Sequence, residues 1–325
     1  MILRNFIFIF LLLITACTAR KEEGTFTFKL GHLANEEHVW HQSALHFADL
    51  VSEKSQGKVT IKVYPNEQLG SETDNLTGIL AGTMDMTITG ETLQNYVEEA
   101  ALVAVPYMID DTTHLQRVAG GPIGKKIEEK ITGVGFRPVA WFQRGARELT
   151  SNQPVRKPED LQGMILRVPN VPLFINNWQA LGAKATPMAF SEVFTALQQG
   201  TIQAQENPLS LIHSAAFFEV QDYVNLTDHV IGWVYLVIGE KQFQKLPEDL
   251  QKAVLEAGKE MQQYHDQLFL EQQKIYENKL KEAGMEFIEV DKAAFRQKAL
   301  PAVKANLKPV QLELFEEIVE VGEGV

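Results

Sequence analysis

The stretch VTIKVYPNEQLGSETDNLTGILAGTMDMTI, residues 59–88, decides the fold class. Val59–Tyr64 alternates apolar and polar side chains as a half-buried strand does, and a proline stops it. Glu72–Ala81 predicts a helix that ends at Gly82, and Met84–Ile88 predicts a short buried strand. Strand, helix and strand in this order indicate an α/β fold in which most strands run parallel.

The residues on the amino-terminal side follow the same plan. Thr25–Leu33 opens with alternating apolar residues, which predicts a strand. An amphipathic helix that ends near Gly57 follows, because apolar residues recur at helical spacing on one face. Those residues are Trp40, Ala44, Phe47, Ala48 and Val51.

A second copy of the plan lies later in the chain. The pentapeptide GTIQA (residues 200–204) corresponds to GTMDM (residues 82–86), and each closes a helix and begins a strand. The helix before the second copy is predicted at Ser191–Gln199. A Lys-x-x-Pro tetrapeptide precedes both copies and ends at Pro65 and at Pro187. The correspondence predicts two similar lobes, and two lobes that face each other form a cleft.

A single long helix is predicted over Pro247–Glu282. Pro247 suits the first helical position, acidic residues follow it in the first turn, and Gly284 follows the end. At about 1.5 Å per residue this helix would be on the order of 50 Å long, which exceeds one small lobe. Its apolar residues keep no strict heptad, so a helix spanning both lobes is favoured over a coiled coil. Met285–Val290 predicts a late strand, and a helical tail follows from Phe295.

Composition narrows the class of protein. The chain has 325 residues with 45% hydrophobic side chains, which suggests roughly two globular domains. Its 30 Lys and Arg against 42 Asp and Glu give a formal net charge of −12, which argues against nucleic acid as a partner. One cysteine excludes an internal disulfide and a cysteine-based zinc cluster.

The amino terminus predicts export. Arg4 precedes the apolar run Phe6–Ile14, which is too short to cross a bilayer but fits the core of a signal peptide. The tetrapeptide Ile-Thr-Ala-Cys that ends at Cys17 resembles the lipobox of bacterial lipoproteins, in which the thiol carries a lipid; an ordinary signal peptide is the alternative. We predict a lipoprotein signal peptide over residues 1–17, a polar tether over residues 18–25, and a periplasmic or otherwise extracytoplasmic body anchored to a membrane by the lipid.

The patterns that could carry catalysis are incomplete. His38 and His41 have a spacing that can bind zinc, but no H-E-x-x-H is present and the pair lies at a helix start. Gly120–Lys126 lacks the spacing and the Ser or Thr of a phosphate loop, so it predicts a helix amino-terminal turn. Gly-x-Ser-x-Gly is absent, and no cysteine is available as a nucleophile. We therefore predict no enzyme, no metal and no cofactor.

Arginines in apolar segments point to anion recognition. Trp141–Asn152 carries Arg144 and Arg147, and Arg167 stands between Leu and Val and is followed by Pro. A buried guanidinium needs a planar partner, and a carboxylate supplies it with two parallel hydrogen bonds. A ligand carboxylate and an internal salt bridge to Asp or Glu both fit this pattern.

Two motifs make the chain recognisable. PMAFSEVFTALQ (residues 187–198) and QENP (residues 205–208) resemble the signature of the substrate-binding proteins of TRAP (tripartite ATP-independent periplasmic) transporters, the DctP family. The resemblance covers most of the mature chain. Further matching segments are Lys54–Lys58, Tyr64–Gly70, Val105–Tyr107, Thr150–Asn152, Leu166–Asn170 and Leu246–Leu250.

The resemblance implies a fold and a role. The fold would be the two-lobed periplasmic-binding-protein (Venus-flytrap) fold, α/β with mixed, mostly parallel sheets and a long helix spanning both lobes. We assign residues 26–145 with 233–272 to lobe I and residues 146–232 with 273–325 to lobe II. The role would be that of a monomeric receptor without catalysis, which closes over a small organic acid and delivers it to the TRAP membrane permease subunits.

The resemblance also implies ligand-binding residues. Arg167 would clamp the ligand carboxylate, and Arg147 would support it. Asn207 would hydrogen-bond the same end of the ligand. Phe190 would form an apolar wall of the cleft.

Departures from sialic-acid-binding relatives bear on the ligand. Leu33 stands where those relatives have Asn and Gly90 where they have Glu, while Glu72 keeps a carboxylate at a comparable place. His32, Glu72 and Glu91 remain as polar candidates for binding ligand hydroxyl groups. These differences argue against sialic acid and for a smaller sugar acid, a hexuronate or an aldonate. C4-dicarboxylates and other 2-hydroxy or keto acids remain open.

Two rival functions are compatible with the sequence. A receptor of the same fold could signal to a sensor instead of a permease. A secreted sugar-acid lyase or isomerase is the second rival, and it would need a general base in the cleft, for which His32 or Glu91 is the best available residue.

Overall fold

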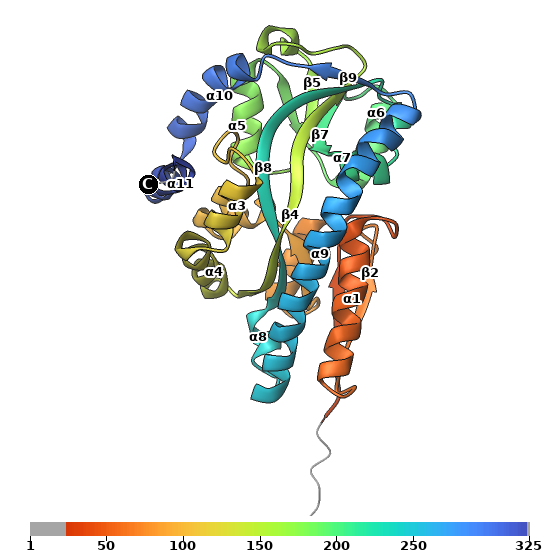
Figure 1. Cartoon of the computed structure of the whole chain (residues 1–325), viewed down its shortest axis with the longest axis vertical. Helices are drawn as coiled ribbons and strands as arrows, with labels where there is room; N and C mark the ends of the chain where they lie inside the picture. The colour runs from red at the N-terminus through yellow and green to blue at the C-terminus, as the bar shows by residue number, and fades with distance from the viewer. Residues whose placement is uncertain (1–23, 324–325) are drawn as a thin grey trace, which may run out of the picture.

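The computed structural model describes residues 24–323, which form a mixed sheet with helices on both faces (Figure 1). In this part of the chain eight of the nine strands take the order β2-β1-β3-β8-β4-β7-β5-β6, and the ninth, β9, pairs with β8 outside that path. The strands are β1 (Phe26–Gly31), β2 (Val59–Tyr64), β3 (Met86–Thr89), β4 (Phe136–Ser151), β5 (Ile165–Val168), β6 (Lys184–Pro187), β7 (Ala204–Pro208), β8 (Tyr223–Gly239) and β9 (Glu286–Glu289).

The helices lie between these strands along the chain. The α-helices are α1 (Val39–Lys54), α2 (Glu72–Ala81), α3 (Thr112–Ala119), α4 (Pro122–Gly133), α5 (Pro172–Leu181), α6 (Val193–Gln198), α7 (Leu209–Ser214), α8 (Glu240–Phe243), α9 (Glu248–Glu282), α10 (Lys292–Asn306) and α11 (Pro309–Glu323). Short 3-10 helices are η1 (Glu91–Asn95), η2 (Glu98–Ala104), η3 (Pro158–Leu161), η4 (Phe190–Glu192) and η5 (Phe217–Glu219).

The sheet is built from two copies of one arrangement. β1 pairs in parallel with β2 and β3, and β5 pairs in parallel with β6 and β7. β3 then pairs antiparallel with β8, and β7 pairs antiparallel with β4. The repeated pentapeptides, residues 82–86 and 200–204, lead into β3 and β7, which hold equivalent places in the order. The predicted two-lobed α/β fold is confirmed, and the lobe boundaries stay a prediction.

The long strands β4 and β8 join the two copies and are irregular. Their antiparallel register shifts between Gln143 and Ala146, where Gly145 has a φ of +87°. A side chain is strained at that φ, and a Cβ there would lie 3.2 Å from the ring of Phe269. Gly145 therefore marks a bulge in the strand, which changes the face on which later residues lie.

The predicted long helix is confirmed as α9. Its 35 residues span about 52 Å at the usual rise, and Figure 1 shows it running beside β4 and β8 along the molecule. It packs on α1, α7 and β4. Pro247 is the N-cap rather than the first helical residue, so the helix begins at Glu248, one residue later than predicted.

Helix α1 follows its predicted face. Trp40, Ala44, Phe47 and Val51 are buried, and they belong to a core shared with α9 and the neighbouring strands. The apolar stripe therefore packs α1 between β2 and α9, as helical spacing predicts.

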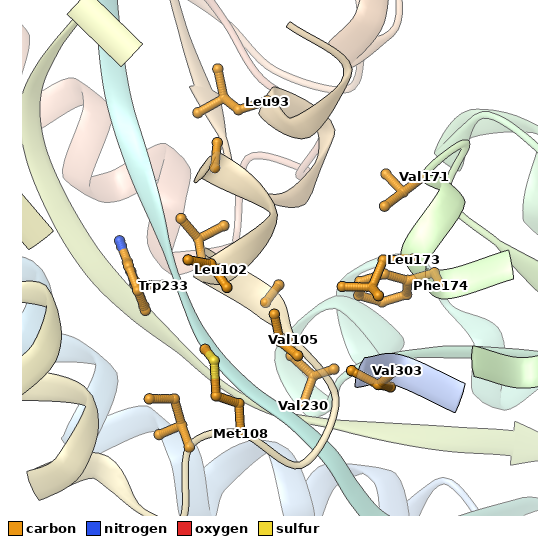
Figure 2. Close-up of a cluster of buried hydrophobic side chains, with 14 of the residues drawn as sticks. Leu93, Leu102, Val105, Met108, Val171, Leu173, Phe174, Val230, Trp233 and Val303 are labelled. Atoms are coloured by element: carbon orange, nitrogen blue, oxygen red, sulfur yellow. The ribbon is translucent and has the colours of Figure 1, made fainter. Parts of the chain in front are cut away.

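A second apolar core lies beside the crossing strands (Figure 2). Leu93 comes from η1, Trp233 from β8, Phe174 from α5 and Val303 from α10, and each is at most 1% exposed. Burying an apolar side chain of this size contributes roughly 1.5–3 kcal/mol. The ring of Phe174 lies 5.2 Å from Cζ of Arg147, so this core supports an arginine of the crossing strand.

Smaller predictions have mixed outcomes. The helix predicted at Ser191–Gln199 is divided into η4 and α6. Gly121 is the N-cap of α4, so the glycine-rich turn begins a helix as predicted. Within residues 24–323 no helix is both long enough and apolar enough to span a bilayer. The predicted signal peptide and Cys17 lie outside the described residues.

Candidate functional site

A cavity of about 440 Å³ opens beside the crossing strands. Its wall draws on β3, β4, β5 and β7, on η4, and on the amino-terminal end of α2. Of the residues predicted for ligand binding, six line this cavity and His32 does not. The six are Arg167, Arg147, Asn207, Phe190, Glu72 and Glu91.

Arg167 is buried in the cavity without a carboxylate partner. It lies in β5 and is 4% exposed. Nε and Nη2 donate to the backbone oxygen of Met188 at 3.0 and 2.6 Å, and Cζ lies 5.9 Å from the ring centroid of Phe190. Among the described residues it forms no ion pair. Burial lowers the pKa of Arg167 to about 10, so the guanidinium stays charged at neutral pH and needs an anion.

The other two arginines of the cavity are already paired with Glu91. Arg144 donates from Nη1 to one Glu91 oxygen at 2.5 Å, and Arg147 donates from Nη1 to the other at 3.2 Å. Burial raises the pKa of Glu91, but the two guanidinium groups outweigh it and the net shift is downward. Glu91 therefore stays ionised and holds both arginines in place.

Arg147 has a second partner in Glu206, which is fully buried in β7. Nη2 donates to Oε1 of Glu206 at 2.7 Å and to its backbone oxygen at 2.8 Å, and His229 lies 2.8 Å from Oε2. Burial opposes the charge of Glu206, yet Arg147 and the hydrogen bonds lower its pKa to about 2. Burial lowers the pKa of His229, so this imidazole is neutral.

The charges of the buried part of the cavity do not cancel. Arg144, Arg147 and Arg167 carry three positive charges. Glu91 on the wall and Glu206 beside Arg147 carry two negative charges, and Glu72, with a pKa raised to about 7, is protonated in part at neutral pH. One positive charge remains when Glu72 is protonated, and among the three arginines Arg167 is the one without an ion pair to a described residue. A single carboxylate on a ligand would balance it.

The bulge in β4 explains why two arginines share one face. Residues three apart in a regular strand point to opposite faces of the sheet, yet Arg144 and Arg147 both line this cavity. The register shift between Gln143 and Ala146 lies between them and restores a common side. Gly90 provides the space, because a Cβ there would lie 3.0 Å from Val234 and 3.5 Å from Nη1 of Arg144.

Asn207 and Phe190 complete the neighbourhood of Arg167. Nδ2 of Asn207 donates to Gln205 at 2.7 Å, and the side chain is 3% exposed at the cavity wall. Phe190 lies in η4 and packs at 5.8 Å, between ring centroids, from Phe217. Asn207 therefore presents an amide group to the cavity, and Phe190 presents an apolar face.

Glu72 is a cavity carboxyl group that, unlike Glu91, has a raised pKa. It is part-buried at the start of α2 and accepts from Thr89 Oγ1 at 2.5 Å and from the Gly90 amide at 3.3 Å. Burial and the neighbouring Glu91 raise the pKa of Glu72 to about 7. Near neutral pH it can therefore both donate and accept a hydrogen bond.

His32 lies outside the cavity, in a cluster of histidines. Its Nε2 is 3.1 Å from Nδ1 of His41, and burial lowers its pKa to about 3. His38 caps α1 by accepting from the Trp40 amide at 3.1 Å. Residues 24–323 contain no group of three or more His, Cys, Asp or Glu placed to hold a metal ion. Neither His32 nor the ion-paired Glu91 has the raised or near-neutral pKa that suits a general base.

The sequence indicates Arg144 as a candidate for anion recognition without its partner, and it gives no role to Glu206, which does not line the cavity, or to several residues that do. Arg144 was visible as a charge in an apolar strand, and Glu206 was visible as an acid in a buried strand, but their pairing needed the fold. Trp40 was interpreted only as a buried helix residue, although it lines the cavity. The acids Glu67, Asp74 and Glu192 gave no signal, because exposed loops and helix ends are ordinary places for acids.

Comparisons with known proteins find a matching family and similar structures. The sequence model of the DctP family, described as bacterial extracellular solute-binding protein, family 7, matches residues 30–308. A TRAP periplasmic solute-binding protein from Roseobacter denitrificans, solved with bound L-galactonate, is 50% identical with a TM-score of 0.89, covering 91% of this chain and 99% of that one.

Two more distant relatives bind other acids. A TRAP periplasmic solute-binding protein from Ochrobacterium anthropi with bound L-fuconate is 31% identical with a TM-score of 0.86, covering 92% of this chain and 99% of that one. The 2,3-diketo-L-gulonate-binding periplasmic protein of Escherichia coli is 32% identical over 272 residues, 82% of each chain.

Proposed function

The chain belongs to the DctP family, the solute-binding proteins of TRAP transporters, and on this premise we propose that its ligand is a six-carbon aldonate such as L-galactonate. Proteins of this family are extracytoplasmic receptors rather than enzymes, and they hand a small organic acid to a membrane permease. The proposal concerns which acid is bound and which residues bind it.

The uncompensated charge of Arg167 carries the proposal. Two parallel hydrogen bonds from a guanidinium to a carboxylate are the strongest recognition that one side chain offers. The cavity volume of about 440 Å³ falls in the range of small-molecule sites. Asn207 adds an amide beside the carboxylate, and Arg147, fixed by Glu206, supports the same end.

The relatives support the choice of a sugar acid. L-galactonate, L-fuconate and 2,3-diketo-L-gulonate each have six carbons and one carboxylate. Hydroxyl groups along such a chain need donors and acceptors, which Glu72, Thr92 and Asn170 offer at the cavity wall. Glu91 has both oxygens on arginines, so it contributes to the charge of the site rather than to hydroxyl binding.

Contacts across the cavity mouth support a closing mechanism. Glu67 accepts from the Ser191 amide at 3.1 Å, and Asn95 donates to the Asn170 backbone oxygen at 3.0 Å. Each bond joins an element of the first sheet copy to one of the second. In the proposed sequence the carboxylate docks on Arg167, the mouth closes on the hydroxyl groups, and the closed form is favoured because it contacts the ligand from both sides.

Calorimetry with a matched pair of ligands tests the proposal. L-Galactonate is expected to bind with a measurable Kd and to raise the melting temperature, because a ligand that binds only the native state stabilises it. Galactitol, which has the same carbon chain without the carboxylate, is expected to bind at least 100-fold more weakly. Equal binding of both compounds, or no binding of any six-carbon aldonate, would contradict the proposal.

We further propose that Cys17 carries the lipid that anchors the receptor. The lone cysteine of the chain stands directly after the small residues that such processing requires. Cells labelled with a radioactive fatty acid are expected to incorporate label into the wild-type protein and not into a Cys17→Ser variant. Equal labelling of the two proteins would exclude this site of attachment.

A further inference from the structure

We infer that the mouth of the cavity rejects a second carboxylate, so that this receptor selects monocarboxylic over dicarboxylic sugar acids. The inference rests on the proposed function, because it concerns the far end of a ligand whose carboxylate is held by Arg167. It concerns the acidic residues Glu67, Asp74 and Glu192, called the acidic mouth below. All three line the cavity, together with the three arginines.

Burial separates the two kinds of charge. The three arginines are at most 4% exposed, whereas Asp74 and Glu192 are exposed and Glu67 is half-buried. The cavity therefore has a cationic interior and an anionic entrance. We place the sixth carbon of a chain held by its first carbon at Arg167 toward this entrance.

Each acid of the mouth is fixed in position by one of its oxygens. Oδ2 of Asp74 accepts from the amide and hydroxyl of Ser71 at 2.9 and 2.6 Å. Oε2 of Glu67 accepts from the Ser191 amide at 3.1 Å, and Oε2 of Glu192 accepts from the Ala189 amide at 3.2 Å. These bonds use one oxygen of each group, so the carboxylates are held in place with their charges intact.

The backbone at Glu67 shows that this placement is maintained at a cost. Asn66 and Glu67 have φ values of 55° and 53°, a left-handed conformation that glutamate seldom adopts. Such a conformation persists only where the surrounding structure determines it. Here it places Glu67 across the mouth from Ser191.

The acidic mouth is compensated at most through space, because Arg167 and Glu67 interact without an ion pair between them. Within the described part of the chain none of its three acids forms an ion pair. The nearby arginines cannot serve a second carboxylate either, because Arg144 and Arg147 are neutralised by Glu91 and Glu206. A dicarboxylate would therefore find one partner for two charges, and its second charge would meet like charges, which disfavours the wrong ligand.

The test compares two acids that differ only at the sixth carbon. Galactarate is galactonate with a carboxylate in place of the terminal CH₂OH group. The wild-type protein is expected to bind galactarate at least 100-fold more weakly than L-galactonate at low ionic strength. In the triple variant Glu67→Gln, Asp74→Asn, Glu192→Gln, which keeps the hydrogen-bond acceptors, the ratio of the two affinities is expected to shift toward galactarate by at least tenfold.

A charge-matched control separates the local field from the net charge. The variant Glu53→Gln, Glu219→Gln, Glu282→Gln removes three exposed acids outside the cavity and is expected to leave the ratio as in the wild type. Added salt is expected to bring the wild-type affinities for L-galactonate and galactarate closer together, because exposed charges are screened. If the wild type binds both acids equally, or if the control triple shifts the ratio as much, the inference fails while the proposed function stands. If neither acid binds, the proposed ligand class is wrong, and the inference that rests on it falls with it.

Discussion

Replacing Arg167 with alanine is expected to weaken L-galactonate binding by on the order of 100-fold. Each charge-assisted hydrogen bond contributes roughly 1.5–3 kcal/mol. The carboxylate loses two of them together with a positive charge that forms no ion pair within residues 24–323. The measurement is the dissociation constant from titration calorimetry. Arg167→Lys is expected to bind more weakly than the wild type as well, because a point charge cannot form the bidentate pair.

The unliganded stability distinguishes a binding residue from a structural one. Alanine removes two bonds to the Met188 oxygen, but it also removes a buried charge without a counter-ion, so the melting temperature is expected to stay near the wild-type value. Arg156→Ala is the matched control, since Arg156 is exposed and lies outside the cavity. Wild-type affinity in Arg167→Ala would remove this residue from the binding site.

Replacing Glu206 with glutamine is expected to lower the free energy of unfolding by about 3 kcal/mol. Breaking a fully buried ion pair leaves the partner charge uncompensated, which costs roughly 3–5 kcal/mol, and the retained amide oxygen offsets part of it. For a protein of this size the melting temperature would fall by about 6–12 °C. Arg147, 2% exposed, would lose its bidentate partner and His229 its acceptor.

An exposed ion pair supplies the control for Glu206. Glu317 pairs with Lys126 at 2.9 Å, and both side chains are partly exposed to solvent, so Glu317→Gln is expected to change stability by less than about 1 kcal/mol. An equal loss of unfolding free energy in Glu206→Gln and Glu317→Gln would show that burial does not determine the contribution of Glu206 to stability.

The pH dependence of the Glu206 effect has a defined sign. The folded-state pKa of about 2 lies below the unfolded value of about 4.3, so the ionised form stabilises the fold. The contribution is fully present above the unfolded value and is lost as pH falls toward the folded value. The stability difference between wild type and Glu206→Gln should therefore shrink below about pH 4.

The sequence predicts the elements that repeat a period over many residues. The face of α1 and the extent of α9 follow from helical spacing alone, and β2 matches its predicted bounds. The observed ends of β3 differ from the predicted ends by up to two residues. Burial on both faces of this strand removes the alternation that marks a strand end. The apolar setting of Arg167 indicates a buried guanidinium, whereas its assignment to the ligand, and any role for Asn207, come from the resemblance to a family.

Pairing between distant residues could not be predicted from the sequence. Arg147 and Arg167 have the same local signature, an arginine in an apolar strand, and the sequence left an internal salt bridge and a ligand open for both. The fold separates them, because Glu91 and Glu206 reach Arg147 and leave Arg167 without an acid. Only the three-dimensional arrangement distinguishes the arginine with acidic partners from the one that we propose binds the ligand.

Because of the bulge at Gly145, the charge pattern of the cavity depends on the number of residues between Arg144 and Arg147. Arg144 and Arg147 line the cavity together only because one extra residue interrupts the strand. Deleting that residue would leave composition and net charge nearly unchanged, yet it would turn one guanidinium to the reverse side of the sheet. Substitutions spread through this strand could preserve its function, whereas a single in-frame codon deletion could not. The genetic tolerance of the site is therefore set by the length of the segment more than by its chemistry.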